Sequence, residues 1–394
     1  MLEVEYINNV LERDSVPMRL IAFYLPQFHE IEENNRLWGK GFTEWTNVKK
    51  AKPLFEGHIQ PVSPLNNNYY NLLDVNVMKW QAEIAKQYGV YGFCFYHYWY
   101  NGTQLLEKPV DNFLANNIDI PFCICWANHD WTSSWKLENK HNIYHKVDYD
   151  DRNDWDVHFN YLLPFLKDSR YIKNDGKPLF VIYETNETKK LNAMLDYWQV
   201  LAKKNGLPGI DFAFQSVYAD EVLGFDDSRF AYDIEYQPQY VRELGYIPHV
   251  RFKETISYYK KRIFGSKNIS ISKAISKGEP TIPTIVDYDE VWEKTLSIGP
   301  IRKKSIPGAF VRMDTTPRKG NRGFVTQGMT PEKFGHYLER QIINCRERYK
   351  KDMIFVFAWN EWAEGGYLEP DSLNGYDVLE QIKGALERTN EFPW

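Results

Sequence analysis

Eight short apolar runs recur along this chain, and stretches with helical periodicity follow several of them. The apolar runs cover residues 19–24, 91–96, 121–127, 179–184, 211–217, 231–236, 308–314 and 353–359. The helical stretches cover residues 74–89, 154–168, 191–206, 330–350 and 376–388. Continuous apolar strands that alternate with amphipathic helices are typical of a parallel sheet covered by helices. Eight such strands predict an α/β fold of the TIM type, a closed (β/α)8 barrel with long βα loops, and leave an open doubly wound sheet as the alternative.

The chain of 394 residues is predicted to fold as a single domain. We assign residues 1–18 to an N-terminal extension and residues 19–394 to the barrel, with an insertion around 240–305. The stretch 250–280 inside this insertion is basic and has helical periodicity. A solvated helical face is the simplest interpretation, and contact with a membrane surface or a partner is the alternative.

Charge and cysteine usage exclude several classes of protein. A net charge of −5 predicts no general affinity for nucleic acid or for an anionic membrane. No apolar stretch reaches the roughly 20 residues of a membrane-spanning helix, and the N-terminus has no basic start or apolar core of a secretory signal. Cys94, Cys123, Cys125 and Cys345 lie in apolar runs, as reduced packing residues do. We therefore expect a cytoplasmic protein, with a peripheral position at the inner face of the membrane as the alternative.

Polar and aromatic residues gather where the predicted strands end. In a barrel these positions meet at one face, where active sites form. Aromatic residues make up 16% of the chain, which fits either a large core or a carbohydrate site, because flat aromatic rings pack against the C–H faces of sugars. The candidate substrate-binding residues are Tyr24, His97, Trp99, Trp126, Asn128, Glu184, Asp314 and Trp359.

Two carboxyl groups, Glu361 and Glu364, directly follow the last apolar run. If the chain turns helically there, their Cβ atoms lie about 5–6 Å apart on one face. Two carboxyls beside a sugar can supply the acid and the base of glycosidic bond chemistry. A pair of solvated loop acids is the alternative. Trp359 and Trp362 enclose the pair, and this setting favours catalysis.

Metal and nucleotide sites have less support. His141 and His145 have i,i+4 spacing, but the metalloprotease glutamate is absent. Neither of the Gly-rich phosphate-binding motifs, GxGxxG and GxxxxGK(S/T), occurs in the sequence. Two Asp-Tyr-Asp triplets, at residues 148–150 and 287–289, each precede a helical stretch, where acidic residues are common. Arg312, Arg318 and Arg322 could hold an anionic sugar or a phosphate, or could belong to an ordinary turn-rich loop. We predict no metal and no cofactor.

Four segments resemble the WbsX family of proteins, which are encoded with bacterial surface-polysaccharide genes. They are residues 23–61, 92–102, 170–184 and 358–371, and the resemblance extends from about residue 19 to residue 388. Members carry a domain similar to glycoside hydrolase family 99 and are often labelled glycosyltransferases. The missing nucleotide site does not support that label.

The resemblance implies a (β/α)8 barrel and a retaining endo-glycosidase directed at α-mannans. Glu361 and Glu364 match the two catalytic carboxylates of the hydrolase family. There the first glutamate is the proposed base toward the sugar 2-hydroxyl, which gives a 1,2-anhydro sugar, and the second is the general acid. Tyr24 matches the first-strand tyrosine of the sugar site.

Two loops depart from the pattern of many relatives. Where those read WANE-x-WTR-x-W, this chain has WANHDWTSSW, so that His129 and Ser133 replace a glutamate and an arginine. Where relatives read WDNTPR, this chain has MDTTPR at residues 313–318. The catalytic pair is untouched, but the substrate specificity of relatives does not transfer directly.

The sequence therefore predicts a glycan-active enzyme that binds an oligo- or polysaccharide. The leading hypothesis is a retaining glycoside hydrolase that acts on bacterial surface polysaccharide or its intermediates. The alternatives are a glycosyltransferase or transglycosylase in O-antigen or capsule biosynthesis, and a non-catalytic glycan-binding barrel. The glutamate pair favours catalysis over binding, whereas consumption of a nucleotide-linked or lipid-linked sugar would favour transfer. Neither the sugar nor the oligomeric state follows from the sequence.

Overall fold

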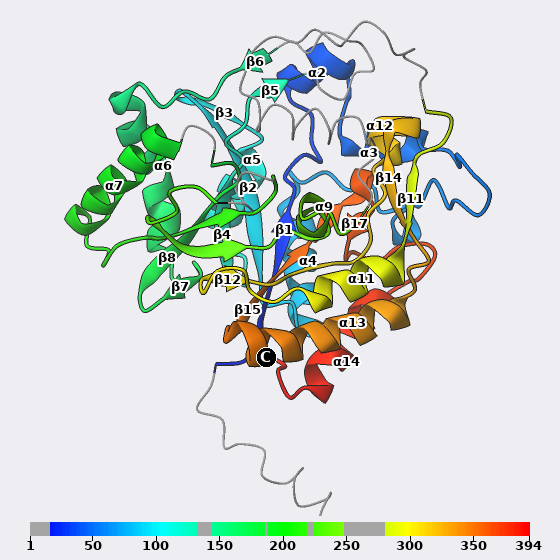
Figure 1. Cartoon of the computed structure of the whole chain (residues 1–394). Helices are drawn as coiled ribbons and strands as arrows, with labels where there is room; N and C mark the ends of the chain where they lie inside the picture. The colour runs from blue at the N-terminus through cyan, green and yellow to red at the C-terminus, as the bar shows by residue number, and fades with distance from the viewer. Residues whose placement is uncertain (1–15, 133–142, 186–187, 219–223, 248–279) are drawn as a thin grey trace, which may run out of the picture.

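The structure is a computed structural model that describes residues 16–132, 143–185, 188–218, 224–247 and 280–394 (Figure 1). Parallel strands pair in the order β12-β10-β9-β8-β4-β2-β1-β15-β13. Their bounds are β1 Arg19–Tyr24, β2 Gly92–Tyr100, β4 Phe122–Trp126, β8 Lys177–Ile182, β9 Asp211–Gln215, β10 Phe230–Ile234, β12 Ser305–Ile306, β13 Gly308–Phe310 and β15 Met353–Phe357. All eight predicted strands are present.

The barrel closes through its seventh strand, which is split in two. β12 pairs with β10 and β13 pairs with β15, and a single residue, Pro307, separates them. Because proline has no N–H to donate, it interrupts a strand at this point. The two ends of the strand path thus meet, and the (β/α)8 barrel predicted from the sequence is confirmed over the open sheet.

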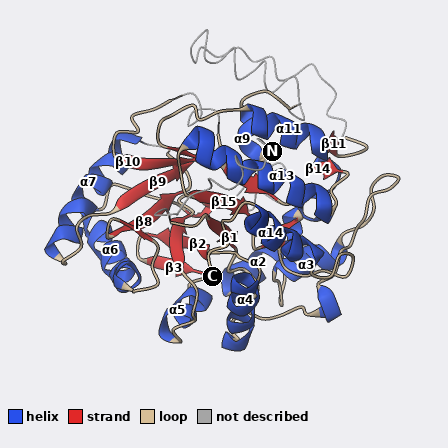
Figure 2. Cartoon of the chain, turned by 90° about the horizontal axis from the view of Figure 1, so that it is seen from below, coloured by secondary structure: helices blue, strands red, loops and turns tan. Residues whose placement is uncertain are grey.

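Helices surround the strands, as Figure 2 shows in the view from below. The long ones are α4 Val75–Gln87, α5 Lys108–Ala115, α6 Arg152–Lys167, α7 Thr188–Lys204, α11 Tyr288–Ser297, α13 Pro331–Asn344 and α14 Asp377–Arg388. Side-chain caps fix several starts, since Asp74, Asp151, Asp287 and Thr330 each accept a hydrogen bond from a backbone N–H of the first turn. One Asp-Tyr-Asp triplet thus supplies a helix cap, Asp287.

Short elements lie in the loops that follow the strands. They are α2 Glu32–Trp38, α3 Glu44–Lys50, η1 Leu65–Asn67, β5 Trp131–Thr132, β6 Ile143–His145, α12 Thr316–Lys319, β16 Asn360–Glu361, η4 Trp362–Glu364 and β17 Gly366–Tyr367. Several of them, such as α2, β5 and β6, lie on the upper side of Figure 1. The strands β11 Thr284–Asp287 and β14 Phe324–Gln327 pair beside them. These are the long βα loops that the sequence predicts.

Inward-facing side chains fill the barrel with aromatic rings. The rings of Phe23 and Tyr96 stack with centroids 5.6 Å apart, and Tyr96 lies 6.2 Å from Tyr183. Tyr236 completes the layer, 5.4 Å from Phe23 and 5.5 Å from Phe357. Part of the aromatic content therefore builds the barrel interior.

The neighbouring residues of the same strands face the helices. The hydroxyl of Tyr24 donates to Gln81 of α4 at 2.7 Å, and Trp126 stacks on Trp198 of α7 at 6.5 Å. Successive side chains of a strand point to opposite faces. Residues one position apart at the strand ends therefore have different environments. One side chain faces the barrel interior and the next faces the helices.

Some predicted features lie outside the described residues. These are residues 1–15 of the N-terminal extension, Ser133 and His141, and nearly all of the basic stretch 250–280. None of the helices in the described part of the chain is both long and apolar enough to cross a membrane.

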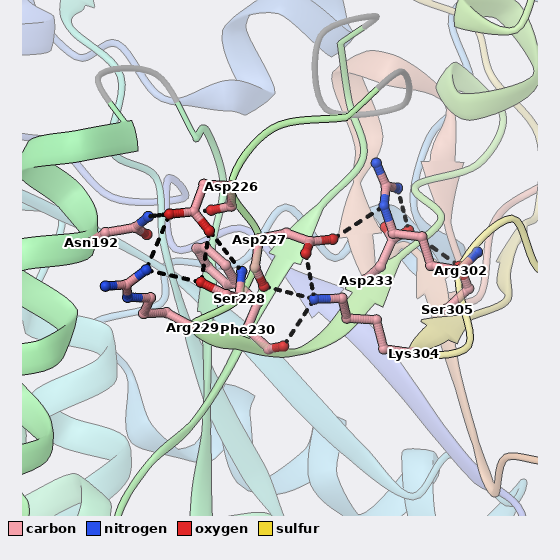
Figure 3. Close-up of polar contacts among 10 residues, drawn as sticks. All are labelled: Asn192, Asp226, Asp227, Ser228, Arg229, Phe230, Asp233, Arg302, Lys304 and Ser305. Carbon is pink, nitrogen blue, oxygen red and sulfur yellow. Dashed lines mark hydrogen bonds and ion pairs between the residues drawn. The ribbon is translucent and has the colours of Figure 1, made fainter.

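A network of ion pairs joins β10 to the segment that leads into β12 (Figure 3). The side chain of Asp233 is fully buried and accepts hydrogen bonds from Arg302 at 2.7 Å and from Ser305 at 3.2 Å. Arg302 and Lys304 also pair with Asp227, at 3.3 and 2.9 Å. The network thus links the sixth strand to the split seventh strand.

We expect Arg302→Met to destabilise the fold far more than Arg229→Met. The first change leaves Asp233 buried without its cation, which typically costs about 3–5 kcal/mol. Arg229 pairs with Asp196 and Asp226, whose side chains are 55% and 58% exposed, and such pairs contribute about 0–1 kcal/mol. Urea unfolding of both variants measures the difference, and equal losses would contradict this role of the network.

Candidate active site

A cavity of about 190 Å³ opens at the carboxyl ends of the strands. Tyrosine, tryptophan and charged residues dominate its wall. The lining residues are Leu25, Gln27, Trp38, Tyr96, Tyr98, Ala127, His129, Asp130, Trp131, Thr132, Tyr183, Tyr236, Arg318, Glu361 and Glu364. The two glutamates singled out in the sequence therefore lie in one cavity at the face where active sites of this fold form.

The turn that carries the pair is fixed by its surroundings. Glu361 ends β16, and Glu364 ends the short helix η4. The side chain of Asn360 accepts from the backbone N–H of Leu25 at 2.7 Å and donates to its carbonyl at 3.0 Å, which ties the turn to the end of β1. Gly365 follows with φ of 68°, and a Cβ there would lie 2.9 Å from the backbone nitrogen of Asp314. Only glycine fits this position without displacement.

Arg318 of α12 connects the pair to a third carboxyl group. Its Nη1 donates to Glu364 at 2.5 Å and its Nη2 to Glu361 at 3.1 Å. Nε and Nη2 also contact Glu44 of α3, at 3.1 and 3.0 Å. Gln27 donates to the other oxygen of Glu44 at 3.1 Å. One guanidinium therefore positions three carboxyl groups from separate segments.

The crowding of carboxyl groups changes their protonation. Burial raises the pKa of Glu361 to about 8; Arg318 opposes this rise, while Glu364 and Glu44 add to it. Burial also raises the pKa of Glu44, although Arg318 again acts in the opposite direction. Burial alone would lower the pKa of Arg318, but the three neighbouring carboxyl groups outweigh burial and raise that pKa. Since a single cation faces three acids, the cluster favours retaining a proton near neutral pH.

Four of the predicted substrate-binding residues point away from the cavity because they lie on the outer face of their strands. Tyr24 is fully buried against α4. His97 contacts His158 of α6 at 2.9 Å, and the indole N–H of Trp99 donates to the carboxylate of Asp154 at 3.0 Å. The fourth, Trp126, packs on Trp198 as described above. None of the four is among the residues lining the cavity.

Asn128, Glu184 and Trp359 are also absent from the cavity wall. The Asn128 side chain bonds both the carbonyl and the N–H of Glu184, at 2.6 and 2.8 Å, which joins two neighbouring strand ends. The Glu184 carboxylate accepts from Tyr218 at 3.0 Å. Trp359 is fully buried and packs on Phe93 at 5.0 Å.

Asp314 lines a separate cavity of about 120 Å³ beside the turn that carries the glutamate pair. Its carboxylate accepts from His58 at 2.8 Å, from Gln60 at 2.7 Å and from the hydroxyl of Thr316 at 2.6 Å. Burial alone would raise the pKa of Asp314, but these hydrogen bonds hold it below its ordinary value. The structure therefore brings Asp314 near the glutamate pair without turning its side chain toward them.

Besides the glutamate pair, the strand-end residues that line the cavity include several one position away from predicted ones, such as Tyr96, Tyr98 and Tyr183. Tyr96, Tyr98, Tyr183 and Tyr236 occupy the inward positions of their strands. The period of two within each apolar run was the signal that could have identified them. The sequence indicated Arg318 only as an anion holder or as part of a turn-rich loop, and it gave no signal for Glu44.

Within the part of the chain that the structure describes, no group of three or more His, Cys, Asp or Glu side chains is arranged to hold a metal ion. His145, one of the two histidines with metal-ligand spacing, lies on β6 with its ring 5.5 Å from Tyr100.

Comparison with known proteins identifies the family. A family model described as Glycosyltransferase WbsX matches residues 20–382. The chain belongs to the WbsX family. Two curated proteins, both named uncharacterized protein WxcX and both from Xanthomonas campestris pv. campestris, are each 31% identical to it over 387 residues. The alignments cover 95% of this chain and 50% of each relative, so the chain spans about half the length of the curated relatives it matches.

Two solved structures with a similar fold are named as glycoside hydrolases. The GH99 endo-α-mannosidase from Bacteroides thetaiotaomicron matches with a TM-score of 0.53 at 12% identity, over 95% of this chain and 98% of that chain. A structure of that name in complex with Bis-Tris propane matches with a TM-score of 0.51 at 13% identity, over 96% and 98%. At this identity the likeness concerns the fold. Family and fold together support a glycan-active enzyme.

The buried pair His97 and His158 predicts that acid destabilises the protein. Burial lowers the pKa of His97 to about 3 and that of His158 well below its ordinary value. In the unfolded chain both take up a proton near pH 6.5, whereas the folded chain keeps them neutral. Their contribution to stability is therefore present above about pH 6.5 and is lost below it, by about 2 kcal/mol per histidine between pH 7 and pH 5.

Urea unfolding at these two pH values tests the pair. His158→Gln should lose less stability on acidification than the unaltered protein does. The matched control, His336→Gln, changes an exposed histidine and should leave the pH dependence as it is. Equal pH dependence in all three proteins would contradict the assignment.

Proposed function

We propose that this WbsX-family protein is a retaining glycoside hydrolase that cleaves an uncharged stretch of bacterial surface polysaccharide or of its intermediates. The observation that carries the proposal is the pair Glu361 and Glu364, held by one guanidinium in a cavity at the barrel face. A paired acid and base beside the glycosidic bond is what this chemistry needs. A non-catalytic binding barrel would gain nothing from burying two acids side by side.

The remaining cavity wall supports a saccharide as the substrate. Tyr98 and Trp131 pack edge to face at 5.4 Å, and Trp38 lines the same cavity. Such rings offer flat faces to a sugar, while the tyrosine hydroxyl and indole N–H groups can bond its hydroxyls. His129, which replaces a glutamate of many relatives, lies 5.2 Å from Tyr183. Burial lowers the pKa of His129 to about 4, so it meets the substrate as a neutral group.

The charge of the cavity favours hydrolysis of a neutral glycan over transfer from a nucleotide sugar. Arg318 is the one cavity-lining side chain, among the described residues, that is positive at neutral pH, and three carboxyl groups already engage it. A diphosphate would bring further negative charge beside Glu361, Glu364 and Asp130. Glycosyl transfer is the second candidate, since the family description names it.

The family resemblance assigns roles within the pair. Glu361 is proposed as the base toward the sugar 2-hydroxyl, and Glu364 as the acid that protonates the departing oxygen. Glu364 suits contact with a leaving group, because its side chain is 19% exposed, compared with 8% for Glu361. Arg318 bonds both carboxyls and so holds the proposed base and the proposed acid in one orientation.

Glu364→Gln tests the hydrolase assignment. It should lower kcat on natural linkages by about 10²–10⁴-fold, since general acid assistance is typically worth that much. An activated aryl leaving group departs without being protonated, so kcat on a substrate that carries one should fall far less. The measurement is product formation by mass spectrometry from defined bacterial polysaccharides and nucleotide sugars, with the anomeric configuration of the first product read by NMR.

Glu347→Gln, which changes an exposed glutamate on the outer surface, is the control and should keep full activity. An unimpaired Glu364→Gln protein would overturn the assignment. Consumption of a nucleotide sugar, with water as a poor acceptor, would establish transfer instead.

The pH dependence tests which glutamate is the base. If Glu361 is the base, kcat/KM should rise with pH through about 8, where the free enzyme loses the Glu361 proton. Glu44→Gln removes a nearby negative charge that raises the Glu361 pKa, so the rising limb should move to lower pH. Activity that instead falls as the pH rises through about 8 would make Glu361 the acid and reverse the roles.

A further inference from the structure

A second cavity, of about 470 Å³, lies on the flank of the barrel between α4 and α14. It shares no lining residue with the cavity of the glutamate pair. Its volume falls within the range of roughly 300–1,000 Å³ in which proteins bind small molecules. Nothing in the proposed reaction uses it, so its lining residues have to be explained separately.

Aromatic residues from α4 and from the start of α14 form part of its wall. Trp80 belongs to α4, and Tyr376 directly precedes α14. Both side chains are partly exposed. A partly exposed ring that faces a cavity offers a flat apolar surface, and sugars stack on such surfaces.

Three consecutive amides, Asn66, Asn67 and Asn68, form another part of the wall. Their side chains are exposed, and the described residues supply no hydrogen-bond partner to them. Asn66 and Asn67 both have left-handed backbone conformations, with φ of 56° and 54°. Each amide can donate and accept at the same time, as hydroxyl groups of a sugar require.

The loop that presents these amides is attached to the segment after the catalytic turn. The N–H of Leu65 donates to the carbonyl of Pro370 at 3.0 Å, and the N–H of Ser372 donates to the carbonyl of Ser63 at 2.9 Å. The backbone of this loop is therefore anchored before any ligand arrives, which reduces the entropy lost when its side chains bind one.

The chemistry of the wall selects an uncharged ligand. No lysine, arginine or histidine lines this cavity, so it offers no countercharge to an anion. Glu369 is 3% exposed, lines the cavity, and accepts from Gln81 at 2.6 Å and from Tyr70 at 2.8 Å. The combination of aromatic faces, exposed amides and one buried acceptor matches a ring that carries several hydroxyl groups.

We propose that this flank cavity is a second saccharide-binding site, which takes a pyranose ring of an uncharged glycan on Trp80 and bonds its hydroxyls through Asn66, Asn67 and Asn68. The inference rests on this cavity and does not depend on the roles of Glu361 and Glu364.

Occupancy of the site also touches the catalytic turn. Trp362, which separates Glu361 from Glu364 in the sequence, lines the flank cavity. Its indole N–H donates to Glu369 at 2.6 Å. A glycan bound on the flank therefore contacts the same turn that holds the glutamate pair.

The experiment measures glycoside binding with the first cavity impaired. In the background of Tyr98→Ala, the full chain is titrated with neutral methyl glycosides of glucose, galactose, mannose and N-acetylglucosamine, by ligand-observed saturation-transfer NMR. At least one should bind. Adding Asn67→Gly keeps the left-handed backbone and removes the amide, so binding should weaken by about five- to tenfold, as loss of one hydrogen bond does.

Asn117→Gly is the matched control, since Asn117 is also exposed and has φ of 49° but lines neither cavity. It should leave the affinity unchanged. Trp80→Ala, which removes the stacking face, should abolish binding, and Asn67→Gly keeps the test valid if that variant does not fold. The proposal is overturned if no neutral glycoside binds, if Asn67→Gly binds as well as the control, or if the methyl glycoside of glucuronic acid binds better than the neutral ones.

Discussion

The ion cluster around Arg318 is the interaction on which the candidate active site depends. Its guanidinium bonds Glu44 from the first βα loop, and Glu361 and Glu364 from the turn after β15. Burial raises the pKa of Glu361, and the positive charge of Arg318 limits that rise. The same contacts couple the positions of the three carboxyl groups to their protonation, because moving any one of them changes the field at the other two. Geometry and acid–base chemistry are therefore set by one side chain.

Most of the barrel could be predicted from the sequence, because parallel strands that are buried on both faces leave continuous apolar runs. Each of the eight runs became a strand, and each of the five helical stretches became a helix. The apolar runs could not decide whether the sheet closes into a barrel, because an open sheet produces the same pattern. Closure depends on the seventh strand, where Pro307 lets β12 pair on one side and β13 on the other. That arrangement is a matter of tertiary pairing.

The site was predicted less completely, for two physical reasons. At the ends of β2 and β4 the prediction chose His97, Trp99 and Trp126, whereas the cavity is lined by inward residues such as Tyr96 and Tyr98. Polarity marks a strand end, but the phase of the strand decides which face a residue takes. The ion cluster was missed for a different reason. Glu44 and Arg318 are 274 residues apart in the chain, and no local pattern in a single sequence relates them.

The four acids that follow β15 have different tasks, and their partners account for each. Glu361 and Glu364 face the cavity and share Arg318. Glu369 accepts the indole N–H of Trp362, so it braces the turn from the opposite side. Burial raises the pKa of Glu369 to about 7, against the hydrogen bonds it accepts. Asp371 accepts from Arg312 at 3.2 Å and from Tyr367 at 2.7 Å, beyond the end of β17.

This division explains why so acidic a segment can follow a buried strand. Two of its carboxyls are kept available at the cavity, and the other two are engaged by fixed donors that hold the turn in place. Because Trp362 lies between the pair in sequence and borders the flank cavity, the braced turn contributes to both cavities. A glycan-active enzyme that handles a long chain has a use for both, since contacts away from the scissile bond supply the binding energy that positions the reacting sugar.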